Sequence, residues 1–452
     1  MRVGSARPLR VLQAERPPAT GGLEGPEPVR TTPTQATALV SAGHGVHDAY
    51  TAILPALLPL LQARFALTET LLALLVAAFS FSSSFPAPLL GALADRLGPR
   101  LMTALGIALT AVLLSLVGIA SSFAMLLVLV VVAGLGSAAL HPAGSLLARG
   151  PATLKADVAV ALFSAGGMIG YAVGPVVVLF VVARFGLEAT PWLLVPGIVV
   201  AGLVYALLPR GRTPMRQRGG VLRLDPELVS GPVGLLTLAG TLSYLPFLAF
   251  VSAVPLWLVQ IQGLPADDPW IGLTLTVFSL AAAAGGVTAG LMSVWFRRDR
   301  LVAALMVLAV GPLFAVFYTQ PGSAAYIAAV AMAGALSYAS APLLVVSAQD
   351  LAPRAAAAAS GMLIGLAAGF AALLYVAVGW LQEVIGLGPA LAGSYLALLP
   401  AAALAHRVLR AHPTPPRPAT SGALQEMACA CLAAGPLGLR GAQSQPMEHE
   451  AR

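Results

Sequence analysis

Twelve long apolar runs, separated by short polar links, constrain this chain more than any other feature. Each run has 18 or more residues, enough for a helix to cross the hydrocarbon core of a bilayer, about 30 Å thick. Of the 452 residues, 58% are hydrophobic and 10% are charged, whereas a soluble domain carries about 25% charged residues. The sequence therefore predicts an all-α membrane protein with twelve transmembrane helices. We place them at residues 37–62, 70–93, 101–119, 124–147, 157–182, 191–208, 232–259, 271–294, 301–318, 323–347, 356–381 and 388–406.

The longest internal polar link, residues 209–231, divides these runs into two groups of six. We therefore expect an N-terminal six-helix bundle at 37–208 and a C-terminal six-helix bundle at 232–406, joined by a cytoplasmic linker. The flanking segments 1–36 and 407–452 have the polar, Pro- and Arg-rich composition of disordered arms. Two six-helix halves with a site at their interface are a recurring plan of membrane transporters.

A glycine stripe at four-residue spacing returns after 195 residues, in the fifth and the eleventh run. Such a stripe lets a neighbouring helix approach closely, so we expect both stripes to serve helix packing. Their matching places indicate that the two halves are pseudo-symmetric copies. The members are Gly166, Gly170 and Gly174 in the first half and Gly361, Gly365 and Gly369 in the second.

The positive charge of the chain is distributed as a topology signal. The formal net charge is +7, and 23 of the 25 Lys and Arg residues lie in the terminal segments and the even-numbered links. Only Arg64 and Arg184 fall in the odd-numbered links. By the positive-inside rule, we expect a cell (inner or plasma) membrane protein with both termini in the cytoplasm. The basicity thus indicates orientation, and we expect no nucleic-acid partner.

Asp48 is the one carboxylate that we place at bilayer depth, and His44 lies one helical turn before it. An ionised side chain at the centre of a membrane costs roughly 2.5–3.5 kcal/mol, so it is rarely carried without use. A carboxyl beside an imidazole can hold and release a proton, and we predict proton coupling at Asp48 and His44. The alternative is a structural carboxylate bonded to a neighbouring helix. His47 points roughly 100° away from Asp48 around the helix, where we expect it to pack or line a cavity.

Further polar residues in the apolar runs are candidates for a substrate cavity. His141 and Ser145 lie one turn apart in the fourth run. Either an interior hydrogen bond or a substrate contact explains His141, and a bond between helices explains Ser145. The other cavity candidates, each of which packing alone also explains, are Tyr171, Tyr244, Tyr338 and Gln349.

The link after the second run reads GALADRLGPR, residues 91–100. Gly91 permits close helix contact, Gly98-Pro99 form a tight turn, and the charges can pair with helix ends. The string resembles the signature loop of the major facilitator superfamily, and this resemblance implies a latch of the cytoplasmic gate. The matching stretch of the second half, 290–300, has lost the Asp at the place of Asp95, and we expect it to keep only the basic cluster. We therefore expect an asymmetric latch with Asp95 as its main acidic member. The predicted gate residues are Gly91, Asp95, Arg96, Gly98, Arg100, Arg149 and Arg354.

The fifth run carries a second motif, GxxxGP, which ends at Gly174-Pro175. It resembles the antiporter-type motif of drug exporters in that superfamily, although Val176–Val178 replace the glycines that usually follow the proline. Pro175 removes a backbone donor and should kink or loosen the helix. The resemblance favours export over uptake.

Three stretches resemble the fosmidomycin resistance protein family of efflux permeases. They are HGVHD at 44–48, HPAGSLLAR at 141–149 and AQDLAP at 348–353, the last followed by Ser360-Gly361. Two positions depart from that family, which has Asn at the place of His47 and Glu at the place of Ala143. The lost Glu removes a carboxylate that could bind protons or a cationic substrate, so the substrate range does not carry over.

These observations predict a secondary transporter that works by alternating access and expels a small organic molecule or drug in exchange for protons. A chain with two halves can function as a monomer. No GxxxxGK[ST] string is present, which argues against ATP-driven transport. We expect no cofactor and no metal, although the tail pair Cys429 and Cys431 could bind one.

Three alternative functions remain open. One is proton-coupled uptake of a sugar or carboxylate. Another is an intramembrane hydrolase that uses Ser145 and His141, which could touch at one turn apart. The third is a membrane sensor or scaffold that transports nothing.

Overall fold

The computed structural model describes residues 33–148, 156–208 and 226–413, and every regular element in these stretches is a helix. The first half contains α1 (Pro33–Thr51), α2 (Ile53–Phe65), α3 (Glu69–Ser84), α4 (Ala87–Leu97), α5 (Pro99–Ser115), η1 (Leu116–Ile119), α6 (Phe123–Ala148), α7 (Ala156–Phe185), η2 (Leu187–Leu193) and α8 (Leu194–Leu207). The second half contains α9 (Pro226–Ser230), α10 (Pro232–Gln260), α11 (Pro269–Met292), α12 (Arg298–Ala315), η3 (Val316–Tyr318), α13 (Ala324–Leu351), η4 (Pro353–Ala355), α14 (Ala356–Gly361), η5 (Met362–Leu366), α15 (Ala367–Ile385), α16 (Leu387–Tyr395) and α17 (Leu398–Ala411).

Ten helical spans in this described part of the chain are long and apolar enough to cross a membrane. The two remaining expected runs are each formed by two successive helices, α1 with α2 and α3 with α4. The ends of all twelve differ from the expected ends by no more than five residues. The prediction of an all-α membrane protein with twelve spanning segments is therefore confirmed.

Proline explains the two breaks. Inside a helix, a proline ring clashes with the carbonyl of the residue four positions earlier. For Pro55 that residue is Thr51, and α1 ends there. Pro86 has no backbone N–H to donate, and α3 ends two residues before it.

The helical part extends beyond the expected domain limits at three places. α1 begins at Pro33, four residues before 37, because proline is favoured in the first turn of a helix. α9, which also begins with a proline, lies inside the expected linker 209–231. α17 continues to Ala411, past the expected limit at 406, and carries Arg410 in its last turn, where a cation interacts favourably with the helix dipole.

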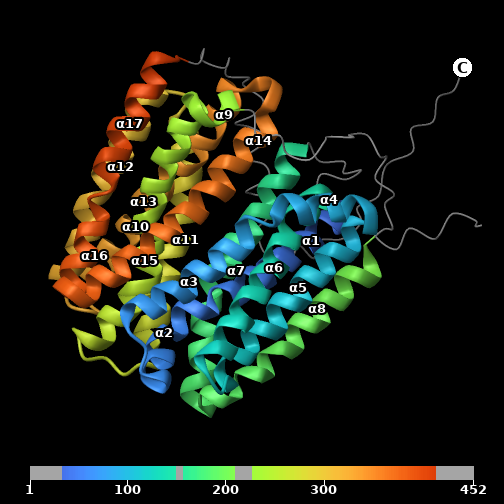
Figure 1. The fold of residues 1–452 in the computed structure, drawn as a ribbon, viewed down its shortest axis with the longest axis vertical. Coiled ribbons are helices and arrows are strands. Elements are labelled where there is room, and N and C mark those ends of the chain that lie inside the picture. Colours follow the sequence, from blue (N-terminus) through green and yellow to red (C-terminus); the bar gives the residue numbers. More distant parts are fainter. Residues whose placement is uncertain (1–32, 149–155, 209–225, 414–452) are drawn as a thin grey trace, which may run out of the picture.

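The helices form two groups that follow the sequence (Figure 1). In the first group, α1 packs on α7, and α5 packs on α6 and α8. In the second, α11 packs on α13, and α10 packs on α15 and α17. Large apolar side chains such as Phe180 and Trp295, each 67% exposed, cover the outside and suit contact with lipid.

In the described part of the chain, the two halves meet mainly through the packing of α2 on α10, α3 on α15 and α7 on α11. α3 approaches α15 from Glu69 and Thr70, which lie against Gly379, as far as Phe85, which lies against Gly369. Beyond this point α4 packs on α5 and α6 of its own half, and α14 packs on α13 of its own half. The halves are therefore joined most closely at the end formed by the links 66–68 and 261–268.

Candidate functional site

Asp48 lies on α1 between two imidazoles of the same helix. Its Oδ2 atom is 3.2 Å from Nε2 of His44, and its Oδ1 atom accepts a hydrogen bond from Nδ1 of His47 at 2.8 Å. The expectation that His47 points away from Asp48 is wrong. Neighbouring residues start about 100° apart on a helix, but the imidazole and the carboxylate are long enough to turn toward each other.

His141, from the middle of α6, completes this cluster. Its Nε2 atom lies 3.3 Å from Nε2 of His44, and its ring meets those of His44 and His47 edge-on, with centroids 5.0 and 5.5 Å apart. The aromatic ring of Phe163 stacks on His44 with a centroid distance of 4.0 Å. Four polar side chains from two helices thus converge at one place.

Backbone carbonyls determine which nitrogen of each histidine carries hydrogen. His44 donates from Nδ1 to the carbonyl of Phe163 at 2.7 Å, and His141 donates from Nδ1 to the carbonyl of Ser137 at 2.9 Å. A carbonyl only accepts, so in the neutral form of either ring Nε2 is the atom with a free lone pair. Two such lone pairs and one carboxylate oxygen therefore face one another. This arrangement is stabilised by a shared proton or by a cation.

Tyrosines from both halves lie within range of the charge on Asp48. They are Tyr171 of α7, Tyr244 of α10 and Tyr338 of α13, all half-buried. Phe247 lies between Tyr244 and Tyr338, with ring centroids 5.5 and 5.4 Å away. The carboxylate is 17% exposed, and His141 is exposed although it comes from the middle of its helix. Asp48 therefore lies between the halves, opposite an aromatic wall of the second one.

The first glycine stripe brings α7 against the backbone of α1. A methyl group on Gly170 would lie 1.7 Å from the carbonyl oxygen of Gly45. The same group on Gly166 and Gly174 would lie 2.3 and 2.2 Å from carbonyl oxygens one turn away on α1. Only glycine permits this approach. Gly167, on the side of the cluster, would place a methyl group 2.5 Å from Asp48 Oδ2 and 2.5 Å from His44 Cε1.

The second stripe is arranged differently. Met362–Leu366, between its glycines, form a π-helical turn, and a methyl group on Gly361 would meet nothing within 4 Å in the described part of the chain. A methyl group on Gly365 would lie 3.9 Å from the carbonyl oxygen of Ser84, and one on Gly369 would meet the ring of Phe85. Pro175, which follows the first stripe, lies with its carbonyl 3.2 Å from the methyl position of Gly272 on α11. Gly369 and Pro175 thus take part in contacts between the halves.

The predicted gate residues lie around the link between α4 and α5. Gly98 has a φ of +94°, a conformation that glycine adopts without strain, and it separates the two helices. Arg100 donates to the carbonyl of Leu208 at 3.0 Å and lies 4.5 Å from the ring of Tyr205. Gly91 faces Pro142 of α6, and Arg96 is exposed. Arg149 and the side chains of Asp95 and Arg354 lie outside the described residues.

Two ion pairs in the second half were not identified from the sequence. Arg298 of α12 donates to Asp350 of α13 at 2.7 Å. Asp299 is buried and lies 3.1 Å from Nε of Arg297 and 3.8 Å from Nδ1 of His406. Acids are therefore present beside the basic cluster, contrary to the expectation that this half keeps basic residues alone. Asp299 stands next to Arg298 in the sequence, which was a usable signal, whereas Asp350 is 52 positions from Arg298.

A polar contact at the joined end of the halves was also missed. Gln260, at the end of α10, donates to Gln62 of α2 at 2.8 Å and to Glu69 of α3 at 3.2 Å. Glu383 of α15 accepts from the backbone of Thr70 at 2.8 Å. Gln62 ends the first run and Gln260 directly follows the end of the seventh, so their equivalent places were a usable signal.

Two cavity candidates have local partners away from Asp48. Ser145 donates to the carbonyl of Pro142 on its own helix at 3.0 Å. Gln349 donates to Ser360 at 2.7 Å, between α13 and α14. Neither contact brings the residue into the cluster.

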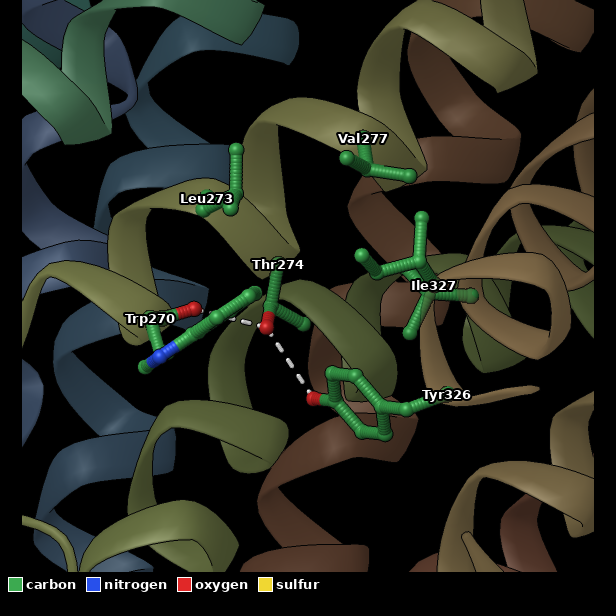
Figure 2. Close-up of a pocket in the computed structure, with 7 residues that line it drawn as sticks. Trp270, Leu273, Thr274, Val277, Tyr326 and Ile327 are labelled. Atoms are coloured by element: carbon green, nitrogen blue, oxygen red, sulfur yellow. Dashed lines mark hydrogen bonds between the residues drawn. The ribbon is translucent and has the colours of Figure 1, made fainter. Parts of the chain in front are cut away.

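A small hollow with room for about one water molecule lies in the second half, between α11 and α13. Figure 2 shows the hydroxyl of Thr274 bonded to the carbonyl of Trp270 and to the hydroxyl of Tyr326, at 2.7 and 3.0 Å. Its other lining residues are apolar, among them Leu273, Val277 and Ile327. The hydroxyls of Thr274 and Tyr326 and the carbonyl of Trp270 already bond to one another, so we assign no ligand to it.

Two helix bundles with a buried polar cluster between them define a membrane transporter. The chain belongs to the Major Facilitator Superfamily, whose family model matches residues 40–376. Members of this superfamily are transporters and not enzymes, so the hydrolase alternative for Ser145 and His141 is not supported. The chain is a multi-pass membrane protein that takes a small-molecule substrate.

Two curated relatives match most of the chain. An uncharacterized MFS-type transporter, YfnC of Bacillus subtilis (strain 168), is 28% identical over 368 residues, which are 78% of this chain and 87% of that protein. The fosmidomycin resistance protein of Escherichia coli (strain K12) is 25% identical over 355 residues, which are 76% of this chain and 85% of that protein.

Solved structures show the same fold at low identity. A bacterial homolog of the human lysosomal transporter Spinster, inward-facing and unoccupied, superposes with a TM-score of 0.64 at 17% identity, over 85% of this chain and 98% of that one. A point mutant of the nucleoside transporter NupG superposes with a TM-score of 0.66 at 14% identity, over 84% of this chain and all of that one.

Proposed function

We propose that the transporter expels a small organic molecule or drug in exchange for protons, by alternating access, and that it works as a monomer. The observation that carries this proposal is the place of Asp48. Its carboxylate is held by His44 and His47 of the first half and interacts with Tyr244 and Tyr338 of the second. A proton bound there changes the charge at the interface that must rearrange during transport.

The cluster supports a coupling mechanism in which Asp48 and His44 carry the proton. In the charged state the carboxylate attracts the imidazole of His44, and the pair holds α1 in one arrangement. Protonation of Asp48 cancels that attraction and alters its interaction with the tyrosines. A shift of the gate equilibrium from 1:99 to 99:1 needs about 5.5 kcal/mol, which proton binding driven by the membrane gradient and substrate binding supply together.

The aromatic wall suggests the kind of substrate. Tyr244 and Tyr338 of this wall, which pack on the buried ring of Phe247, and Tyr171 of the first half offer ring faces and hydroxyl groups, which suit a small molecule with apolar and polar parts. The antiporter-type motif ending at Pro175 and the similarity to the fosmidomycin resistance protein support export.

We propose that α4 and α14 face the cytoplasm and that the Gln62, Glu69 and Gln260 contact faces the outside. The excess of Lys and Arg in the even-numbered links supports this orientation. In this orientation the halves are held together on the outer side, and we expect the cluster, of which His141 is the exposed member, to be reached from the cytoplasmic side.

Proton flux in proteoliposomes of known orientation tests the proposal. The vesicles contain a pH-sensitive dye and are given a panel of drugs, sugars and carboxylates. We expect drugs to move protons with the unmodified chain and with Asp267→Asn, a control acid in the link 261–268. Asp48→Asn at equal reconstitution should abolish this movement. Drug-driven flux that survives in Asp48→Asn removes Asp48 as the carrier, and acidification driven by sugars or carboxylates favours uptake instead.

A further inference from the structure

Three of the six histidines of this chain gather around one aspartate, in a cluster open to solvent on one side. One ring nitrogen of His44, one ring nitrogen of His141 and one carboxylate oxygen of Asp48 all lie within 4.8 Å of one another. We propose that these three side chains form a binding site for a divalent transition-metal ion of the Zn²⁺ type. The proposal concerns binding only and does not depend on the direction or coupling of transport.

The distances fit the coordination shell of such an ion. Zn²⁺ binds imidazole nitrogens and carboxylate oxygens at about 2.0–2.2 Å, so neighbouring ligand atoms of a tetrahedron are about 3.3–3.5 Å apart. Nε2 of His44 is 3.3 Å from Nε2 of His141 and 3.2 Å from Oδ2 of Asp48. These two sides of the ligand triangle already have the required length.

The hydrogen bonds of the two histidines are those of metal ligands. A metal-bound histidine almost always donates its other nitrogen to a carbonyl or carboxylate, which holds the ring and its tautomer in place. His44 donates from Nδ1 to the carbonyl of Phe163, and His141 donates from Nδ1 to the carbonyl of Ser137. Both rings therefore present an Nε2 lone pair to the same point before any ion arrives.

His47 orients the third ligand. Its Nδ1 atom donates to Oδ1 of Asp48 at 2.8 Å, which leaves Oδ2 directed toward His44. This places His47 in the outer shell as a positioning residue. Among the described residues, Nε2 of His47 has no hydrogen-bond partner, so the ring is held through Nδ1 and by packing.

The chemistry of the ligands selects the ion. Two imidazoles and one carboxylate suit Zn²⁺, Co²⁺, Ni²⁺ or Cu²⁺, whereas Mg²⁺ and Ca²⁺ prefer shells of oxygen. Three protein ligands leave a fourth position for water or another small ligand. Because His141 is exposed while His44 is 6% exposed, an ion can enter past His141 and reach the buried ligand behind it.

The experiment uses the full chain, purified with a tag free of histidine, in a Cys429→Ser/Cys431→Ser background that removes the thiols of the tail. Zn²⁺ binding is measured by titration calorimetry and by metal analysis, and Co²⁺ binding by visible absorption. We expect one Zn²⁺ per chain and a Co²⁺ spectrum of four-coordinate geometry. If this parent protein binds no equivalent of Zn²⁺, or if Co²⁺ gives no four-coordinate spectrum, the proposal is overturned, whatever the variants do.

Matched variants then locate the ion. His141→Ala should lose the bound equivalent, whereas His406→Ala, on α17 of the second half, should keep it. His47→Ala should weaken binding about 10- to 100-fold, the usual effect of removing an outer-shell partner. Each variant is checked for folding by size-exclusion chromatography. Unchanged stoichiometry and affinity in a folded His141→Ala protein would falsify the site. All readings are taken without a membrane gradient, so failure of proton-coupled transport leaves them unaffected.

Discussion

Nε2 of His44 lies 3.3 Å from Nε2 of His141, although the two histidines are 97 positions apart in the chain. The contact joins α1 to α6, and it occurs directly beside the carboxylate of Asp48. Two acceptor atoms at this distance repel each other unless a proton or a cation lies between them. The contact therefore identifies the point of the molecule at which binding of a positive charge stabilises the packing of the first half.

Gly167→Ala tests whether transport depends on the geometry of this cluster. The new methyl group would lie 2.5 Å from Oδ2 of Asp48 and 2.7 Å from Nε2 of His44, so one of these side chains must move. Displacement of reacting groups by about 1 Å can cost a factor of about 100 in rate, and we expect drug-driven proton flux to fall at least about tenfold. The measurement is the initial rate of acidification in proteoliposomes. Gly202→Ala, on α8 with nothing within 4 Å, is the control, and equal rates for both variants would contradict the prediction.

The fold was largely predictable because the membrane imposes a simple pattern. Each spanning helix needs an apolar run of a certain length, and the runs predicted the helix ends to within five residues. The glycines at 166, 170 and 174 predicted a close helix contact, since a missing side chain has few other uses at that spacing. The partner helix was not predictable, because a run of apolar residues does not specify which face meets which neighbour.

The cluster was predictable only in part. Spacing along one helix placed His44 beside Asp48, but the reach of a side chain decided that His47 bonds to the same carboxylate. His141 joins them through tertiary packing, for which the sequence holds no local signal. The pairs of Arg298 with Asp350 and of Gln260 with Gln62 likewise join distant segments. Only their places at the ends of apolar runs indicated a role.

Gly170→Ala tests how strongly the first glycine stripe supports the fold. A methyl group at 1.7 Å from the carbonyl of Gly45 meets backbone, which cannot rotate away, so α1 and α7 must separate. Overpacking of this kind costs about 1–3 kcal/mol or more. We expect a lower midpoint of thermal unfolding in detergent, followed by tryptophan fluorescence. Gly202→Ala should leave the midpoint unchanged or raise it, because alanine stabilises a helix by about 0.5–1 kcal/mol over glycine. Equal midpoints for the two variants would show that α1 and α7 can separate without loss of stability, which would contradict the prediction.

The pair of Arg298 and Asp350 should stabilise the contact of α12 with α13. Their side chains are 20% and 19% exposed and 2.7 Å apart, so solvent screens the pair only in part. A double-mutant cycle with Arg298→Ala and Asp350→Ala should give a coupling energy of about 1 kcal/mol, toward the upper end for ion pairs near a surface. The measurement is the free energy of unfolding in a sodium dodecyl sulfate titration. Arg407→Ala, an exposed arginine on α17, should show no coupling to Asp350→Ala, and equal coupling for both arginines would rule out a specific pair.

Gln260→Ala should loosen the joined end of the two halves, because it removes the hydrogen bonds to Gln62 and Glu69. Both bonds leave from the same amide nitrogen of Gln260, so we count them together as one bond of about 0.5–1.5 kcal/mol net. The equilibrium should then shift by about 2- to 10-fold toward the form in which this end is open. The measurement is the distance distribution between spin labels on Ala63→Cys and Gln262→Cys, both exposed at this end, with Cys429 and Cys431 replaced by serine.

The matched control for this shift is Gln320→Ala. Gln320 is exposed in the link between η3 and α13. Gln320→Ala is therefore the same substitution at an exposed glutamine, but it removes no hydrogen bond between the halves. We expect the long-distance population to grow with Gln260→Ala and to stay constant with Gln320→Ala. If both variants leave the distribution unchanged, the apolar contacts of α2 with α10 and of α3 with α15 hold this end by themselves, and the gating role of Gln260 is refuted.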